Sequence, residues 1–346
     1  MSTPTEPAEA EEHLGAVEES RQPKQAVSAK VPPAAKASII VLGVAALISL
    51  PLILGDYRLL LANMMLINGI VVLGLVPLLG WSGQFAFISA AFMAVGAYTG
   101  GRLLNLVDGL PLEVGLLLGC AGGALIGLAF GALAVRVKGY YLAVVTVSFM
   151  FVVEMVAREG GGVTGGVDGF LISAPPVLVL GLNPLKGVST YYIGLALTII
   201  VLAFVMWLRR TALARGWAAL SVDEHLAQAV GVNPYRSRLI AFVIASSIFG
   251  LAGTWYAVVT QYVQPHTFGF GLMLTHFVFL IVGGVKSPIG AWIAAIVLTV
   301  ASEYIRSFAG ISEIVYGATL LIAVLVMRRG IAGIIERITR TRERWA

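Results

Sequence analysis

Charged residues and cysteine are both scarce in this chain. Only 12% of its 346 residues are charged, about half of the roughly 25% found in soluble domains, whereas 58% are hydrophobic and the mean hydropathy is +0.92. This composition excludes a water-soluble fold.

The single cysteine, Cys120, lies in an apolar run and has no second thiol to pair with. An internal disulfide is therefore excluded, and neither redox chemistry nor a zinc site is expected.

Motifs for covalent chemistry are also absent. No Gly-x-x-x-x-Gly-Lys-Ser/Thr loop is present to cradle a phosphate, so the chain has no ATP site of that kind. No Gly-x-Ser-x-Gly elbow occurs, and the four histidines, at positions 13, 225, 266 and 276, show no metal-binding spacing. The sequence therefore predicts no catalytic residues, no metal and no cofactor bound by this chain. A membrane-embedded enzyme remains an alternative, with no constellation of residues to support it.

The first 38 residues differ from the rest of the chain. They contain no Phe, Tyr or Trp, are rich in Ala, Glu, Pro and Ser, and carry four basic and six acidic residues. Such a segment buries too little apolar surface to fold, so we expect 1–38 to be a disordered cytoplasmic tail. Residues 39–330 form the predicted membrane domain, and 331–346 form a short basic cytoplasmic tail.

Apolar segments dominate the membrane domain. At about 20 residues per crossing, the sequence predicts an all-α polytopic bundle with about ten transmembrane segments. They are 39–54, 59–79, 84–101, 111–135, 139–157, 190–208, 239–262, 268–284, 288–305 and 312–327. The third segment is rich in small residues, and a re-entrant segment at 84–101 is an alternative that would change the count.

The basic residues predict the orientation of these crossings, because Lys and Arg near membrane ends stay on the cytoplasmic side. Ten crossings with both termini cytoplasmic place 14 of the 19 basic residues of the body inside. The two longest connections are then a cytoplasmic loop at 209–238 and an external loop at 158–189. The expected surroundings are membrane lipid, and no nucleic-acid partner is expected.

A few polar side chains fall within the apolar segments, where an ionisable group costs about 2.5 to 3.5 kcal/mol near the bilayer centre. Glu154 lies four residues before Arg158, so the sequence allows either a local ion pair or a role in a solute path. His276 could donate to a solute or to a neighbouring helix. Asn63 and Asn68 are expected to bond to neighbouring helices.

Residues 218–234 have a short helical pattern that ends at a helix-stopping Gly231 and then Pro234. This segment resembles the coupling loop of ATP-binding-cassette importer permeases, in which Glu-Ala-Ala, three residues and Gly enter a groove of the ATPase. An interfacial helix packed under the bundle is the simpler alternative. The resemblance assigns the coupling role to Ala219, Asp223, Glu224, Ala227, Ala229, Gly231 and Pro234.

Further blocks occur in the order found in one permease family. They lie at 80–84, 90–92, 96–98, 139–149, 164–169, 241–246, 250–253 and 283–284. Together they resemble the branched-chain amino-acid permeases of the LivM type, a family that urea permeases resemble throughout. Four places depart from the family pattern: 221–224 reads Ser-Val-Asp-Glu, 226–229 reads Leu-Ala-Gln-Ala, 85–88 reads Phe-Ala-Phe-Ile where the family has a Ser and a His, and His276 stands near a family Ser.

The resemblance implies a permease that forms the solute path for Leu, Ile or Val in a bacterial plasma (inner) membrane. The implied partners are a second homologous permease of the LivH type, two ATP-binding-cassette ATPases that hold ATP and Mg, and a periplasmic or lipid-anchored solute-binding protein. Import of urea or short amides by the same machinery, or a stand-alone secondary transporter, are the alternatives. The candidate residues for the solute path are Gln84, Thr146, Glu154, Thr164, Gly165, Gly166 and His276.

Overall fold

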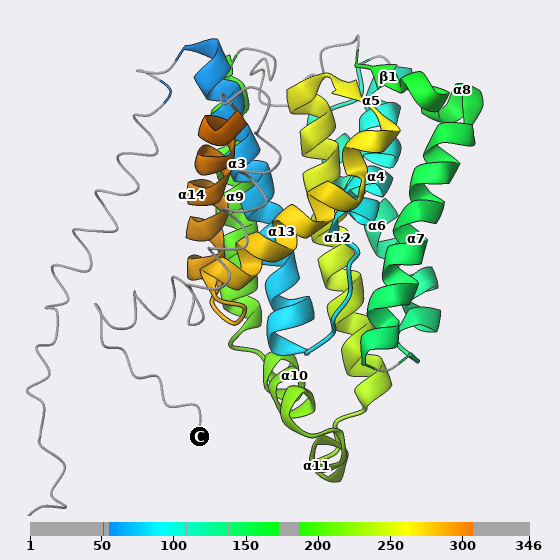
Figure 1. Cartoon of the computed structure of the whole chain (residues 1–346), viewed down its shortest axis with the longest axis vertical. Coiled ribbons are helices and arrows are strands. Elements are labelled where there is room, and N and C mark those ends of the chain that lie inside the picture. The colour runs from blue at the N-terminus through cyan, green and yellow to red at the C-terminus, as the bar shows by residue number, and fades with distance from the viewer. Residues whose placement is uncertain (1–50, 52–54, 108, 138, 173–186, 307–346) are drawn as a thin grey trace, which may run out of the picture.

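The computed structural model describes residue 51 and residues 55–107, 109–137, 139–172 and 187–306, which form a helical bundle (Figure 1). Among these residues, six helices are long and apolar enough to cross a membrane, and Pro288–Tyr304 is a shorter apolar helix. These seven correspond to seven of the ten predicted segments. The predicted segment 312–327, nearly all of 39–54 and both predicted tails lie outside the described residues.

The elements follow one another with short connections. They are α3 (Asp56–Leu75), the π-helix η1 (Val76–Trp81), α4 (Ser89–Gly96), η2 (Ala97–Gly101), α5 (Arg102–Leu106), α6 (Leu112–Ala134), α7 (Tyr140–Glu159), α8 (Gly161–Thr164), η3 (Gly166–Asp168), β1 (Phe170–Leu171), α9 (Gly187–Leu208), α10 (Ala212–Val222), α11 (Glu224–Ala229), α12 (Pro234–Thr260), β2 (Tyr262–Val263), η4 (Pro265–Phe268), α13 (Phe270–Gly283) and α14 (Pro288–Arg306).

The bundle has two distinct ends (Figure 1). Helices α10 and α11 lie at one end, named here the coupling end after the role predicted for 209–238, while β1, α5 and α8 lie at the other, named the external end after the predicted orientation. Helices α3, α6 and α9 run toward the coupling end, and α7 and α12 run back from it. This alternation agrees with the order of crossings that the basic residues predict.

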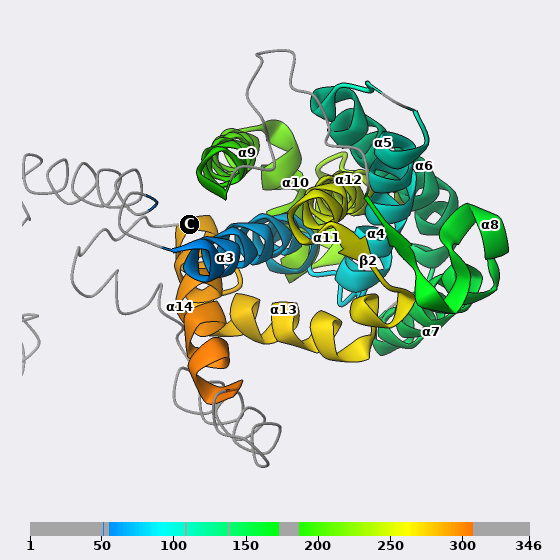
Figure 2. The same cartoon turned by 90° about the horizontal axis from the view of Figure 1, so that it is seen from above.

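Glycine brings α6 and α12 close together at the centre of the bundle. In the view from above, α12 lies between α3 and α4 (Figure 2). Helix α6 carries a glycine at every fourth position, and all five are buried: Gly115, Gly119, Gly123, Gly127 and Gly131. A Cβ at Gly127 would lie 2.6 Å from the Cβ of Ser246 on α12, well inside van der Waals contact. Close packing therefore explains these glycines, as small residues do between membrane helices.

The segment predicted at 84–101 crosses the bundle as a broken helix. Its first residues, 84–88, are not helical, and helix begins only at Ser89; all eight residues of α4 are buried. At the coupling end, Gln84 Nε2 donates to the carbonyl oxygen of Arg238 at 3.0 Å. At the external end, Arg102 donates to the carbonyl oxygens of Gly162 and Val163. The segment therefore runs from one end of the described bundle to the other.

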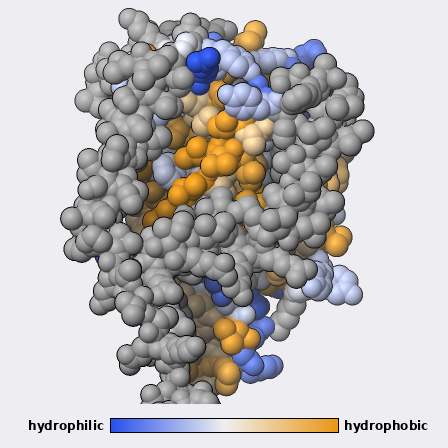
Figure 3. Space-filling model, turned by 60° about the vertical axis from the view of Figure 1, so that its left-hand side comes forward, coloured by the Kyte–Doolittle hydropathy of each residue, from blue (hydrophilic) through white to orange (hydrophobic). Residues whose placement is uncertain are grey.

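The outer surface is apolar between the ends. Figure 3 shows one side of the bundle, with hydrophobic residues across its middle and hydrophilic residues gathered near its top and bottom. Large apolar side chains on the long helices are exposed, among them Leu117 at 68%, Leu125 at 68% and Ile200 at 63%. In water this exposure would be unfavourable, and it fits a chain surrounded by lipid and by partner helices.

Candidate coupling loop and buried polar sites

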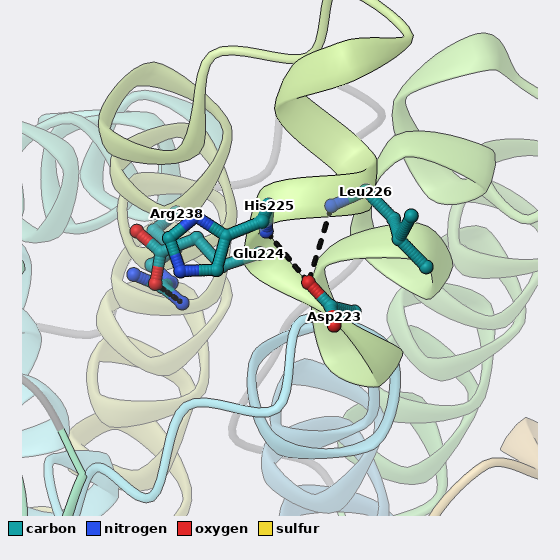
Figure 4. Close-up of polar contacts among 5 residues, drawn as sticks. All are labelled: Asp223, Glu224, His225, Leu226 and Arg238. Carbon is teal, nitrogen blue, oxygen red and sulfur yellow. Dashed lines mark hydrogen bonds and ion pairs between the residues drawn. The ribbon is translucent and has the colours of Figure 1, made fainter.

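The start of α11 is fixed by Asp223. Its carboxylate accepts hydrogen bonds from the backbone nitrogen of His225 at 2.7 Å and from that of Leu226 at 3.1 Å (Figure 4). These are the free N–H groups of the first helical turn, so Asp223 is the N-cap. The bonds from Leu226 and His225 favour the charged carboxylate and lower the pKa of Asp223.

The end of α11 is equally well defined. Gly231 has φ +84°, and its nitrogen donates to the Gln228 carbonyl at 2.9 Å, while the nitrogen of Val232 donates to the Ala227 carbonyl at 3.0 Å. This pair of bonds is a Schellman motif, which needs a residue with positive φ at the Gly231 position. Pro234 then begins α12. Two of the predicted coupling residues, Gly231 and Pro234, therefore set the exit of the chain from α11.

The exposed face of the loop differs from the one expected from the sequence. Ala227 is only 1% exposed and packs into the bundle, Ala219 is partly buried, and only Ala229 of the three alanines is exposed. The prominent exposed side chains are Val222 at 83%, Leu226 at 67% and Val230 at 74%. The sequence interpretation missed these three; Leu226 and Val230 are four residues apart along α11 and its C-cap, whereas Val222 ends α10 before the break at Asp223.

Two contacts join α10 and α11 to the start of α12. Glu224 pairs with Arg238 at 3.2 Å, and the two side chains face each other in Figure 4. The buried indole of Trp217 on α10 donates to the Ser237 carbonyl at 2.7 Å and stacks on Trp81, with ring centroids 6.5 Å apart. The coupling loop is therefore attached to the bundle through both of its helices.

Gln84 and Thr146 lie together near the coupling end. Gln84 is 3% exposed, and its Nε2 donates to Ser82 and to the Arg238 carbonyl. Thr146 is fully buried; its hydroxyl donates to a carbonyl of its own helix and accepts from the backbone nitrogen of Phe87 at 3.0 Å. The Gln84 amide nitrogen and the Thr146 hydroxyl therefore hold the non-helical stretch before α4, while Gln84 Oε1 is buried without a hydrogen-bond partner in the described structure.

The external loop residues form a tightly folded turn. Gly165 and Gly166 have φ +83° and +65°, and Thr164 Oγ1 accepts from the Gly166 nitrogen at 3.3 Å. The strand β1 that follows pairs antiparallel with β2, and Tyr262 donates to the Asp168 carbonyl at 2.7 Å. Thr164, Gly165 and Gly166 thus shape the external end and lie away from the middle of the bundle.

Glu154 forms the local ion pair that its spacing allows, because Arg158 Nη2 lies 2.7 Å from its carboxylate.

His276 is fully buried between helices. Its Nε2 lies 3.2 Å from Asn68 Oδ1, and its Nδ1 lies 3.3 Å from the Ser89 hydroxyl. Asn68 Nδ2 donates to the Thr299 hydroxyl at 2.9 Å. Because Asn68 Oδ1 can only accept, Nε2 carries the proton and Nδ1 accepts from Ser89.

This chain of polar groups joins α3, α4, α13 and α14, as expected for Asn68 and for the structural alternative at His276. The expectation for Asn63 was wrong, because its amide donates to the Leu59 carbonyl one turn earlier in the same helix.

The seven candidate solute-path residues are dispersed. They occupy the coupling end, the middle and the external end, and they form no common site among the described residues.

Comparison with known proteins identifies the family. The family described as branched-chain amino acid transport system / permease component matches residues 57–324. The high-affinity branched-chain amino acid transport system permease protein LivM of Escherichia coli is 29% identical over 297 residues, which cover 78% of this chain and 69% of the relative. LivH of the same organism is 27% identical over 139 residues, covering 38% and 44%.

The autoinducer 2 import system permease protein LsrC of an Enterobacter species is 28% identical over 200 residues, covering 56% of this chain and 55% of the relative. No solved structure matches this chain. The family match covers most of the described helices and agrees with a multi-pass helical protein of the inner membrane. This chain belongs to the permease components of branched-chain amino acid transport systems.

Proposed function

We propose that this permease imports branched-chain amino acids and takes its driving force from ATPase subunits that bind the coupling loop at 209–238. The observation that carries the proposal is the exposure of three apolar side chains, Val222, Leu226 and Val230, at the end of α10 and along α11, a helix that is capped at both of its ends. Exposed apolar side chains outside the bilayer are typical of a protein interface. The chain has no phosphate-binding loop of its own, so ATP and Mg would be held by the partner.

The partners follow from the same proposal. A second permease of the LivH type would complete the solute path, and this chain matches LivH over 139 residues. A periplasmic or lipid-anchored binding protein would deliver the amino acid at the external end. The exposed Val163, Val167 and Leu171 there, held by the β1–β2 pairing, suit such a contact.

The test separates docking from solute identity. Leu226→Asp places a charge among these exposed apolar side chains without disturbing a buried contact. The control is Val167→Asp, which makes the same kind of change at the external end. We expect Leu226→Asp, and not Val167→Asp, to lose the ATPase subunits during purification from membranes. Retention of the ATPase by Leu226→Asp would contradict the docking assignment.

Uptake measurements then identify the solute and the energy source. Cells that lack the chain are complemented with it, and uptake of labelled leucine and labelled urea is followed in parallel. Leucine uptake that depends on the ATPase supports the proposal. Urea uptake would keep the machinery and replace the solute, while leucine uptake that continues without the ATPase would favour a secondary transporter.

A further inference from the structure

The non-helical stretch at residues 83–88 interrupts helical structure between η1 and α4. Gly83 has φ +67°, a conformation that turns the chain out of the preceding helix. The backbone groups that follow are held by specific partners: the Gln84 nitrogen donates to the Leu78 carbonyl at 3.1 Å, and the Phe87 nitrogen donates to the Thr146 hydroxyl at 3.0 Å. The stretch is thus a non-helical joint that leads directly into the fully buried α4.

One residue of α12 contacts both this joint and the coupling loop. The carbonyl oxygen of Arg238 accepts from Gln84 Nε2 at 3.0 Å, and its guanidinium lies 3.2 Å from the Glu224 carboxylate at the start of α11. The side chains of Arg238 and Glu224 are only 20% and 22% exposed. Partial shielding from water strengthens the attraction of such a pair relative to one on an open surface.

We infer that Arg238 is a positioning residue that transmits movement of α11 to residues 83–88, through its ion pair with Glu224 and its hydrogen bond with Gln84. From there the movement reaches α4 through the chain itself and α7 through Thr146. Helical segments on either side of the joint move as units, whereas the non-helical stretch can change its backbone angles. The inference rests on the proposed function, since it needs an ATPase that moves the coupling loop.

The first test measures coupling in the assembled transporter. In vesicles containing the whole complex, we expect Arg238→Glu and Glu224→Arg each to lower the solute imported per ATP hydrolysed by about five-fold or more, the range of a typical coupling energy. The ATPase should still co-purify with both variants. The double variant Glu224→Arg with Arg238→Glu restores the opposite charges and should recover most of the ratio.

A matched control makes the same charge change outside the coupling loop. Lys286 is exposed between α13 and α14, and its contact with Trp81 uses only its backbone carbonyl, so Lys286→Glu should leave the ratio within about two-fold of the native value, well below the five-fold effect of a coupling residue. An equal loss in Lys286→Glu, or a double variant no better than the singles, would overturn the inference. Loss of the ATPase from Arg238→Glu would overturn it as well, because Arg238 would then act in docking rather than in transmission.

A second measurement reports on the joint itself. Phe85 is next to Gln84 and 47% exposed, so a thiol at this position can be labelled. In a Cys120→Ala background, labelling of Phe85→Cys by a membrane-impermeant reagent should change between nucleotide-free and ATP-bound complexes. The change should disappear when Gln84→Met removes the hydrogen bond to the Arg238 carbonyl. If it persists unchanged in Gln84→Met, movement does not pass through this contact.

Discussion

Replacing a glycine at the contact between α6 and α12 should destabilise the bundle in proportion to what the new methyl group meets. A Cβ at Gly127 would lie 2.6 Å from Ser246 Cβ and 2.7 Å from its Oγ, about 1 Å inside ordinary contact. At Gly250 the added atom would fall against the backbone of Gly119, which cannot rotate away. The two helices would have to separate along their length.

The magnitude follows from two opposing terms. Overpacking of this kind costs about 1 to 3 kcal/mol, whereas exchanging Gly for Ala in a helix gains up to about 1 kcal/mol of propensity. At Gly250 the clash with backbone dominates, so we expect a net loss of about 1 to 2 kcal/mol. Gly271→Ala is the matched control, because a Cβ at Gly271 in α13 meets nothing within 4 Å.

The assay uses the single cysteine. Cys120 lies in α6 and is partly buried, so a thiol-reactive dye can report unfolding of the purified permease during heating. Gly250→Ala should lower Tm by several degrees, at about 2 to 4 °C per kcal/mol, while Gly271→Ala should leave Tm equal or raise it. A Tm of Gly250→Ala equal to or above that of Gly271→Ala would refute the close approach of the two helices.

Three further outcomes are expected. His276→Phe removes the hydrogen bond to Asn68 Oδ1 in the partly buried polar cluster and should cost about 1 to 3 kcal/mol. Thermal unfolding of this variant, of Asn68→Leu and of the double variant should then show less than additive losses. Gly231→Val should reduce uptake more than Gly231→Asn, because Asn tolerates positive φ and a β-branched residue does not. The pKa of Asp223 is lowered, so its carboxylate caps α11 fully at neutral pH, and the cap is lost as pH falls through that lowered pKa. Exchange of the His225 amide proton should therefore be faster in Asp223→Ala than in the native protein at neutral pH. In strong acid the two exchange rates should be equal.

The sequence by itself determined the properties that depend on neighbouring residues. Long apolar runs cannot remain in water and must satisfy their backbone as helices in a bilayer, so α6, α7, α9 and α12 begin and end within a few residues of their predicted bounds. The Glu154–Arg158 pair also follows from spacing, because residues four apart on a helix face the same side. The family could be recognised for the same reason, since its motifs are short and ordered along the chain.

Only the tertiary structure decided which residues meet across the bundle. Gln84 donates to the Arg238 carbonyl, 154 residues away in the chain, and nothing in the sequence signals that contact. Ala227 faces inward because α11 is attached through Glu224 and Arg238, which are 14 residues apart. His276 finds partners on α3 and α4 that are about 200 residues distant in the chain. Periodicity shows which face of a helix is apolar, but the partners of a buried polar group depend on how separate helices pack.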